Sequence, residues 1–442
     1  MKRENIFSVF LAACLVLLVL STGCTDQQPP AAQSGEVKIG VIASMTGAAS
    51  TTGKDIWQSA ELAADEINAK GGIKINSLGK SVPIRLIQGD DESTREGGMK
   101  AVSKLITQDN VDLLVGGYSS AVVSAHQSIV AENKVPYIIS GASSSSVSHR
   151  NDLDTSYMFF HRPNTDDSGE ASVLFIEEVV RPAVNAKFGF AAERPFRVAV
   201  IYQDSPFGKG QLDAVKNVIK ARSLPIEVVA EEPFKMGESD FRTVLTSVKA
   251  KNPDMIYSVT FLNELVPLTQ QARRDVNFNT LIMAIENNDD PDYYKGVGTY
   301  GEGMVMESRF SPYAVPKGST EVATTQFLSN FDKKYGGFAG MMGAATYESI
   351  YIAKEAIEKA GTVEKAKVKD ALSNLAMPQM MEIMKGGTIQ FSPDFRESKF
   401  DLYVVQLSMD QASGEPRPEI IWPENLEARA FVVPDWYTPG TS

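Results

Sequence analysis

Cysteine is nearly absent from this 442-residue chain, and the little there is lies at its start. The two cysteines are Cys14 and Cys24, so we expect neither a disulfide nor a thiol nucleophile in the body of the chain. The three histidines, His126, His149 and His161, stand far apart in the sequence. Without a Cys/His cluster we expect no transition-metal site. These absences exclude thiol catalysis and argue against zinc- or iron-based chemistry.

Positive charge and long apolar runs are also scarce. The formal net charge is −12, which argues against a nucleic-acid partner because like charges repel. Residues 296–301 match G-x-G-x-x-G, but they neither follow a predicted strand nor open a helix. No G-x-S-x-G elbow is present. A secreted α/β enzyme is therefore the least favoured alternative.

The N-terminus has the composition of a targeting segment. Residues 6–20 form an apolar run that suits a signal peptide and is short for a membrane span. The run ends in Leu-Ser-Thr-Gly-Cys at residues 20–24, which resembles a bacterial lipobox. This resemblance implies that residues 1–23 are a lipoprotein signal peptide and that Cys24 carries a lipid anchor; a plain secretory signal is the alternative. Residues 24–36 are expected to form a flexible tether, and the predicted location is extracytoplasmic, at a membrane.

Strand and helix patterns alternate along the rest of the chain. Residues 37–42 form a short apolar run of the buried-strand type, and a helical pattern follows from Lys54 until Gly71 stops it. Further strands are predicted at residues 82–87, 111–115, 135–139, 197–202, 226–230, 255–259, 280–284, 303–307 and 400–407, and later helices include 167–180 and 211–222. Such alternation predicts parallel sheets with crossover helices, and the length suits two α/β lobes.

Residues 37–73 also resemble a known family. Their strand, Thr-Gly loop and helix ending in Asn-Ala-Lys-Gly-Gly-Ile are similar to the start of the branched-chain amino acid (leucine/isoleucine/valine) type of periplasmic solute-binding protein. The resemblance extends to about residue 436. It implies the type I periplasmic-binding-protein fold, α/β, with two doubly wound lobes of parallel-rich sheets joined by a three-stranded hinge. Lobe one would comprise residues 37–162 and 308–392, and lobe two residues 163–307 and 393–442. Residues 181–195 and the tail after 411 are extra length without an assigned role.

Serine-rich loops supply the candidate ligand contacts of lobe one. Ser120 follows a buried strand and opens a helix, whose free N–H groups favour a carboxylate; the alternative is that a serine here only caps the helix. By resemblance, Ala142, Ser143 and Ser144 match the family's Ala-x-Thr element that holds the ligand carboxylate, although this loop could instead be merely flexible. Thr52 stands where a pocket tyrosine is common.

Acidic and aromatic residues supply the remaining candidates. Glu286 follows the strand at 280–284, where the family places an acid that binds the ligand ammonium; a solvated loop acid is the alternative. Phe207, Phe261 and Tyr347 match three aromatic positions of the family that line the ligand pocket. Ordinary core packing is the competing explanation for each ring.

The resemblance implies a binder without catalytic residues, cofactor or metal. Its function would be that of the substrate-binding component of an ABC importer. Such a component acts as a monomer that closes on an amino acid, branched-chain or otherwise apolar, and delivers it to permease subunits with their ATPases. Two alternatives keep the fold: a sensor module that reports its ligand to a receptor, and a binder of amides or small aromatic acids.

Overall fold

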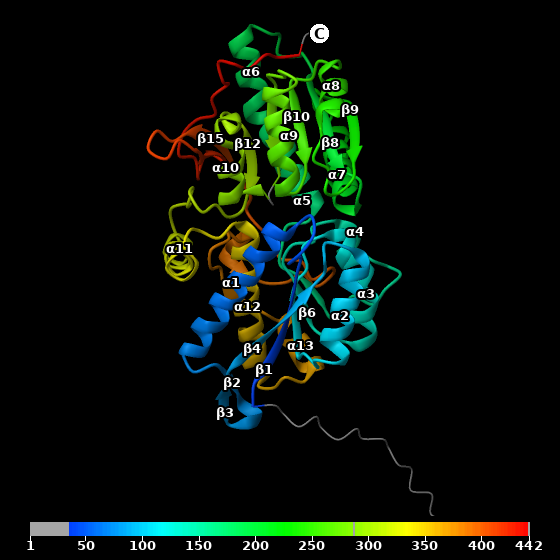
Figure 1. The fold of residues 1–442 in the computed structure, drawn as a ribbon, viewed down its shortest axis with the longest axis vertical. Helices are drawn as coiled ribbons and strands as arrows, with labels where there is room; N and C mark the ends of the chain where they lie inside the picture. Colours follow the sequence, from blue (N-terminus) through cyan, green and yellow to red (C-terminus); the bar gives the residue numbers. More distant parts are fainter. Residues whose placement is uncertain (1–34, 286–287, 441–442) are drawn as a thin grey trace, which may run out of the picture. The chain divides into compact units, whose positions relative to one another are not determined.

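The computed structural model describes residues 35–285 and 288–440 (Figure 1). The predicted signal peptide, Cys24 and most of the predicted tether lie outside the described residues, and so does Glu286. Within the described residues, no helix combines the length and hydropathy needed to cross a membrane.

The first lobe is built on a five-stranded parallel sheet in the order β4-β1-β5-β6-β7. Its strands are β1 (Val37–Ala43), β4 (Ile84–Asp90), β5 (Leu113–Gly116), β6 (Tyr137–Ile139) and β7 (Met158–Phe160). The connections contain α1 (Ser50–Ala69), the β2 (Ile73–Ile75) and β3 (Lys80–Val82) hairpin, α2 (Arg95–Thr107), α3 (Ser120–Asn133) and α4 (Ser145–Ser148). The predicted alternation of strands and helices is confirmed here.

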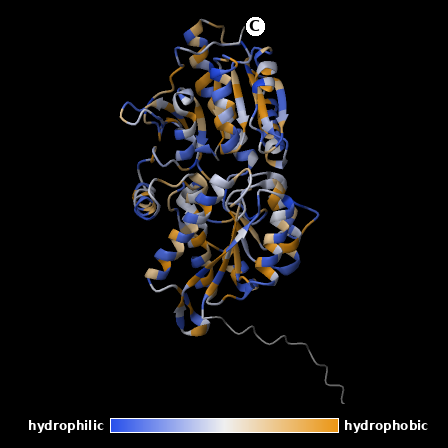
Figure 2. Ribbon diagram, in the orientation of Figure 1, coloured by the Kyte–Doolittle hydropathy of each residue, from blue (hydrophilic) through white to orange (hydrophobic). Residues whose placement is uncertain are grey.

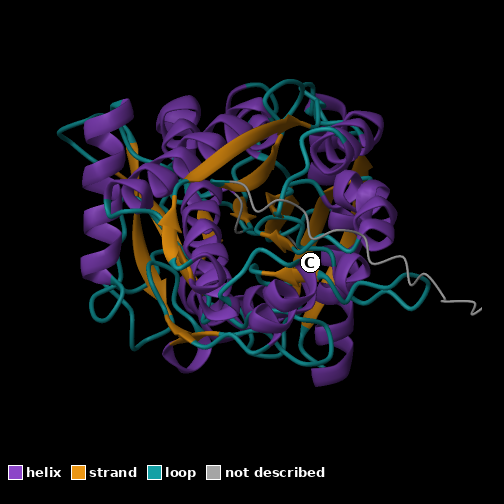
Figure 3. Cartoon of the chain, turned by 90° about the horizontal axis from the view of Figure 1, so that it is seen from below, coloured by secondary structure: helices purple, strands orange, loops and turns teal. Residues whose placement is uncertain are grey.

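The second lobe is built on a seven-stranded sheet in the order β16-β15-β12-β11-β10-β8-β9. Its strands are β8 (Phe196–Gln203), β9 (Ile226–Phe234), β10 (Met255–Val259), β11 (Leu281–Ala284), β12 (Val305–Ser308), β15 (Tyr403–Met409) and β16 (Pro416–Trp422). Its helices are α5 (Thr165–Phe175), α6 (Arg181–Phe188), α7 (Pro206–Arg222), α8 (Arg242–Lys249), α9 (Leu262–Arg274) and α10 (Pro291–Val297). Only β15 and β16 run antiparallel to their neighbours. Figure 3 shows helices surrounding the strands.

The chain passes between the two sheets three times, as the resemblance implies. It leaves the first sheet after β7 and returns after β12 with a second set of elements that belong to lobe one. These are α11 (Glu321–Tyr335), α12 (Met341–Ala360), α13 (Lys365–Ser373), β13 (Met377–Pro378) and β14 (Thr388–Ile389). The third passage leads from β14 to β15. Because α12 packs along α1 and against β5 and β6, this late segment completes lobe one. The residue boundaries given above for the lobes remain a prediction.

Each sheet is covered by helices, so its central strands are buried on both faces, whereas the edge strands β4 and β9 carry exposed polar residues. In β1 all residues except Lys38 are buried, as expected for a strand of a covered parallel sheet. Figure 2 shows hydrophobic colour on the strands and hydrophilic colour on many helix surfaces. Gly53 permits one close approach: a Cβ there would lie 1.9 Å from the Ser44 carbonyl oxygen. Only glycine therefore lets α1 start against the end of β1.

Two helix boundaries differ from the prediction. Helix α7 begins at Pro206 rather than at residue 211, because Ser205 caps it by accepting a hydrogen bond from Gly208 N and proline suits the first turn. Phe207 therefore lies in a helix rather than a loop. The predicted helix 167–180 starts at Thr165 and continues through a π-helical turn into α6, which ends at Phe188.

The two segments of unassigned length contact each other in lobe two. Lys187 Nζ donates hydrogen bonds to the carbonyl oxygens of Val433 (2.8 Å) and Pro434 (3.2 Å). Arg194 donates to the carbonyl oxygen of Gly440 at 2.7 Å and also binds Asp254. The tail additionally contributes β16, a strand that the sequence did not predict. Both segments therefore cover lobe two, away from the site described below.

Candidate functional site

The candidate site lies where the carboxyl ends of the two sheets meet. Parallel α/β sheets bind ligands at this edge, and side chains of the two lobes are in contact there. Ser144 Oγ in lobe one donates a hydrogen bond to the Pro206 carbonyl oxygen in lobe two at 2.9 Å. Asn263 Nδ2 in lobe two donates to the Ala48 carbonyl oxygen in lobe one at 2.6 Å. We call this contact region the interlobe interface.

The structure brings two of the predicted serines together. Ser144 N donates a hydrogen bond to Ser120 Oγ at 3.1 Å, and both residues are buried. The Ser144 hydroxyl also lies 2.9 Å from Ser146 Oγ. The loops after β5 and β6 are therefore joined through hydroxyl groups, and the second loop is held in place by defined contacts.

Ser119 contributes a buried hydroxyl that the sequence could not distinguish from a simple cap. It occupies the N-cap position of α3, but its side chain makes no capping hydrogen bond. Its Oγ is buried and has no hydrogen-bond partner among the described residues. Leaving a buried hydroxyl unpaired costs about 1–3 kcal/mol, so this group is suited to a ligand or water. The start of α3 adds a partial positive charge.

Ala142 and Ser143 have backbone groups that are already bonded within the protein. Ala142 N donates to the Gly117 carbonyl oxygen at 3.0 Å, and the Ala142 carbonyl oxygen accepts from Arg162 Nε at 2.7 Å. The Ser143 carbonyl oxygen accepts from Thr165 N at 2.9 Å. These bonds shape the loop. The contact with the ligand carboxylate that was predicted for Ala142 would therefore have to be made by neighbouring residues of the same loop.

Three aromatic rings cross the interlobe interface. The Phe261 ring lies 4.5 Å from the Tyr118 ring and 5.7 Å from the Phe207 ring, measured between centroids. All three residues are 3–4% exposed. Tyr118 belongs to lobe one, so the rings form an apolar wall shared by both lobes. The sequence analysis indicated Phe207 and Phe261 but missed Tyr118. The position of Tyr118 in the same loop as Ser120 was the feature that could have identified it.

Glu264 organises lobe two behind the rings and was also missed. Its carboxylate accepts hydrogen bonds from Phe261 N (2.8 Å), Gly237 N (2.8 Å) and Gln203 Nε2 (3.2 Å). Burial raises the pKa of Glu264 to about 7. One side chain thus ties together two loops and the end of β8 at the carboxyl edge of the second sheet. Its signal was the acid at the third position of α9, where a capping-box glutamate stands.

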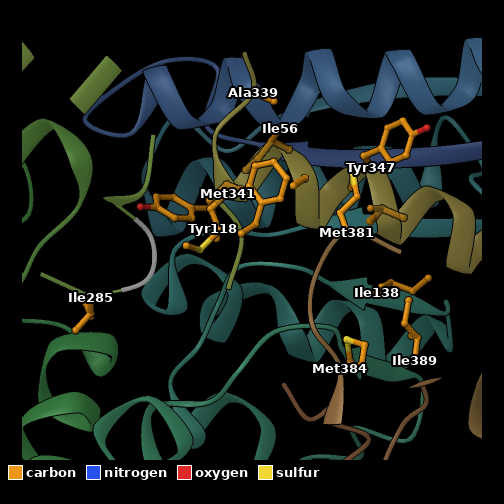
Figure 4. Close-up of a cluster of buried hydrophobic side chains, with 14 of the residues drawn as sticks. Ile56, Tyr118, Ile138, Ile285, Ala339, Met341, Tyr347, Met381, Met384 and Ile389 are labelled. Atoms are coloured by element: carbon orange, nitrogen blue, oxygen red, sulfur yellow. The ribbon is translucent and has the colours of Figure 1, made fainter. Parts of the chain in front are cut away.

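Tyr347 does not join the other predicted residues. Its hydroxyl donates to Glu66 Oε2 at 2.5 Å, and its ring packs 4.7 Å from that of Phe327. Glu66 lies fourteen residues beyond Thr52 on α1, which corresponds to about 21 Å of helix. In Figure 4 Tyr347 is well apart from Tyr118. Tyr347 is therefore a core residue of lobe one, whereas Thr52 is buried near the start of α1, beside the interface.

One group of side chains in the described residues has the geometry of a metal site. His161 Nε2 lies 2.9 Å from Glu348 Oε2 and 3.3 Å from Glu382 Oε2, and all three residues are fully buried. Arg309 Nε lies 3.1 Å from Glu382 Oε1. Burial alone would lower the pKa of His161, but hydrogen bonds to the two carboxylates outweigh it and raise that pKa. Each of the two carboxylates therefore already has a partner within the protein, His161 for both and Arg309 for Glu382.

The comparisons with known proteins agree with this geometry. The periplasmic binding protein family model (Peripla_BP_6) matches residues 36–414. The Leu/Ile/Val-binding protein BraC3 of Rhizobium johnstonii is 26% identical over 333 residues, which is 75% of this chain and 81% of that protein.

Two solved structures share the fold. The branched-chain amino acid transporter substrate binding protein LivJ from Streptococcus pneumoniae, in complex with isoleucine, matches with a TM-score of 0.72 at 21% identity, covering 88% of this chain and 100% of that one. A solute binding protein of an ABC transporter from Rhodopseudomonas palustris, in complex with 3,4-dihydroxybenzoic acid, matches with a TM-score of 0.70 at 20% identity, covering 88% and 97%.

The chain therefore belongs to the periplasmic binding protein family, with the type I fold. This is a family of non-enzymatic binders, so the protein is a binder and not an enzyme.

Proposed function

We propose that this protein is the extracytoplasmic substrate-binding component of an ABC importer and that it binds an apolar amino acid between its lobes. The observation that carries the proposal is the unpartnered Ser119 hydroxyl, buried at the start of α3 beside the Ser120–Ser144 pair. A ligand carboxylate would satisfy this hydroxyl and meet the partial positive charge of the helix start.

The aromatic wall supports an apolar ligand side chain. Tyr118, Phe207 and Phe261 offer buried ring surface and few polar atoms next to the hydroxyl groups. A ligand with a carboxylate at one end and a hydrocarbon group at the other matches both surfaces. The names of the relatives, with leucine, isoleucine and valine among their ligands, agree with this class.

A small aromatic acid is the second candidate. The three rings could stack on a benzene ring as well as on an aliphatic chain, and one of the structural relatives holds 3,4-dihydroxybenzoic acid. The two candidates differ in the amine. We assign the contact with the ligand ammonium to Glu286, which follows β11 in the sequence. A requirement for Glu286 would therefore favour an amino acid over an aromatic acid that has no amine.

We further propose that Cys24 carries a lipid anchor and that the closed protein docks on a permease. The small residues before Cys24 in the sequence support the anchor. Replacing Cys24 with alanine should release the protein from membranes in a cell-fractionation experiment. A sensor module of the same fold is the alternative to import, and a transport assay in cells that lack the gene would separate the two.

Calorimetry on residues 25–442 tests the proposed ligand. The protein is first unfolded and refolded to remove carried-over ligand, then titrated with L-amino acids and with small aromatic and aliphatic acids. We expect micromolar or tighter binding of an aliphatic amino acid, lost in Glu286→Gln but retained in a control such as Glu302→Gln. Binding only of acids without an amine would contradict the amino-acid assignment and the role of Glu286.

A further inference from the structure

We propose that Asn263 is a latch residue that holds the two lobes closed without contacting the ligand. Its Nδ2 donates a hydrogen bond to the Ala48 carbonyl oxygen, 2.6 Å away in the other lobe. The inference rests on one part of the proposed function, namely that the lobes close around a bound solute.

The acceptor is fixed by the loop between β1 and α1. Ser93 Oγ accepts a hydrogen bond from Ala49 N at 3.1 Å and donates one to the Thr46 carbonyl oxygen at 2.8 Å. Asp90 binds the same loop through Met45 N at 3.0 Å. These bonds place the Ala48 carbonyl in one position before the lobes meet.

The donor is fixed by the first turn of α9. Asn263 precedes Glu264, whose carboxylate holds Phe261 N and Gly237 N. A Cβ built on Gly237 would lie 3.3 Å from Ala48 Cβ, so the glycine loop also approaches Ala48 closely. Because both partners are ordered within their own lobes, the hydrogen bond costs little additional entropy when the lobes close.

The latch acts on closure and not on recognition. Asn263 is exposed, whereas the Tyr118, Phe207 and Phe261 rings are buried. A bond that exists only in the closed arrangement shifts the open–closed equilibrium by the same factor for every ligand. Loss of the latch should therefore weaken binding of all ligands equally, mainly through faster dissociation, with selectivity unchanged.

Two substitutions separate a latch from a merely structural residue. Asn263→Ala removes the donor, and we expect affinity to fall about 3- to 10-fold, the loss of one exposed hydrogen bond. Asn263→Asp keeps the shape but places a carboxylate against the Ala48 carbonyl, so the loss should be larger. Aspartate in the first turn of α9 favours the helix, so thermal stability should not fall. Asn217→Ala, on an exposed part of α7, is the matched control.

Closure itself can be measured by pulsed electron paramagnetic resonance on the chain from residue 25, which contains no cysteine. Spin labels at Lys70→Cys and Arg274→Cys report on the far ends of α1 and α9, both exposed. We expect Asn263→Ala and Asn263→Asp to enlarge the long-distance population. If the two variants match the parent protein in distance distribution, with and without ligand, the latch is overturned.

The same experiment separates this inference from the proposed function. If no amino acid or acid in the panel binds, the proposed function fails, but a longer distance in Asn263→Asp would still establish the latch. If amino acids bind, and the parent protein, Asn263→Ala and Asn263→Asp show the same distance distributions, the proposed function stands and the latch fails.

Discussion

The two sides of the interlobe interface have different chemistry. Lobe one offers hydroxyl groups and a helix start, through Ser119, Ser120 and Ser144. Lobe two offers the rings of Phe207 and Phe261. The polar side suits the carboxylate that all amino acids share, whereas the apolar side suits the group that differs among them. If the proposed function holds, lobe one provides the contact common to all ligands, and the lobe-two rings, together with Tyr118 of lobe one, provide selectivity.

The two sides are also held in place differently. In lobe one a hydroxyl binds backbone directly, as in the Ser144 N to Ser120 Oγ bond. In lobe two the ring positions depend on a buried acid, since Glu264 binds the backbone of Phe261 and of Gly237. The hydroxyl contacts of lobe one contain no titratable group, whereas the support of the lobe-two rings depends on a carboxyl group that titrates.

The largest expected effect is on the polar side. Ser120→Asp would place a negative charge where the ligand carboxylate docks, and we expect binding to weaken by at least about 100-fold, since loss of a charge-assisted contact and added repulsion together exceed about 3 kcal/mol. Calorimetry measures the affinity, and circular dichroism checks that the fold is intact. Ser103→Asp on α2 is the control; unchanged affinity in Ser120→Asp would refute the assignment of the polar side.

Phe261→Ala tests the apolar side. Removing this buried ring leaves a cavity beside Tyr118 and Phe207 and should lower the free energy of unfolding by about 3 kcal/mol, as measured by urea denaturation. We expect ligands with large side chains to lose more affinity than alanine or glycine does. Phe395→Ala, at a ring that is 39% exposed, should cost much less. An equal loss for all ligands would argue against the division of roles between the lobes.

The pH dependence of lobe two follows from Glu264. Burial raises its pKa from 4.5 to about 7, so the folded protein binds this proton more tightly than the unfolded chain does. Its stabilising contribution is complete below about pH 4.5 and is lost as the pH rises towards 7. The change amounts to about 3 kcal/mol.

Glu264→Gln isolates this contribution from that of the other buried acids. We expect the free energy of unfolding of the variant, relative to the parent protein, to rise by about 3 kcal/mol between pH 4.5 and pH 7. Urea denaturation at a series of pH values measures it. Parallel curves for the two proteins would show that Glu264 titrates near its ordinary value.

The smallest effect concerns the tail of lobe two. The Arg273 guanidinium lies 3.9 Å from the centre of the Trp436 ring. Trp436→Ala should lower stability by about 1–2 kcal/mol through lost packing and cation–π contact and leave ligand affinity unchanged. Val432→Ala, 56% exposed, should have almost no effect. A change in affinity would mean that the tail influences the interlobe interface.

The parts of the site that could be predicted are those that follow strands. Ser120, Ser144, Phe207 and Phe261 each come shortly after an apolar run, and parallel topology brings such positions to one edge. Tyr347 was assigned to the pocket by resemblance, whereas the structure places it in the core of lobe one. Residues 341–350 of α12 are buried on all sides, although Glu348 and Ser349 are among them, so this stretch gives no periodic signal for which side faces the site.

The missed strand β16 has a similar physical explanation. It contains Pro416 and Pro418, and proline argues against a strand because it cannot donate to a ladder. The strand is tolerated because it lies at the edge of the sheet, paired on one side with β15. Edge position is a property of the assembled sheet and cannot be read from the segment alone.

The sequence by itself determined the α/β class, the succession of strands and helices, and the loops that carry the site. These depend on local periodicity and on turn residues, which act within a few positions along the chain. Only the tertiary structure decided that Tyr118 joins Phe261, that Glu264 binds Gly237 and Gln203, and that Asn263 reaches Ala48. Each of these contacts joins residues far apart in sequence, so it is set by how the two sheets and their helices pack and not by any local pattern.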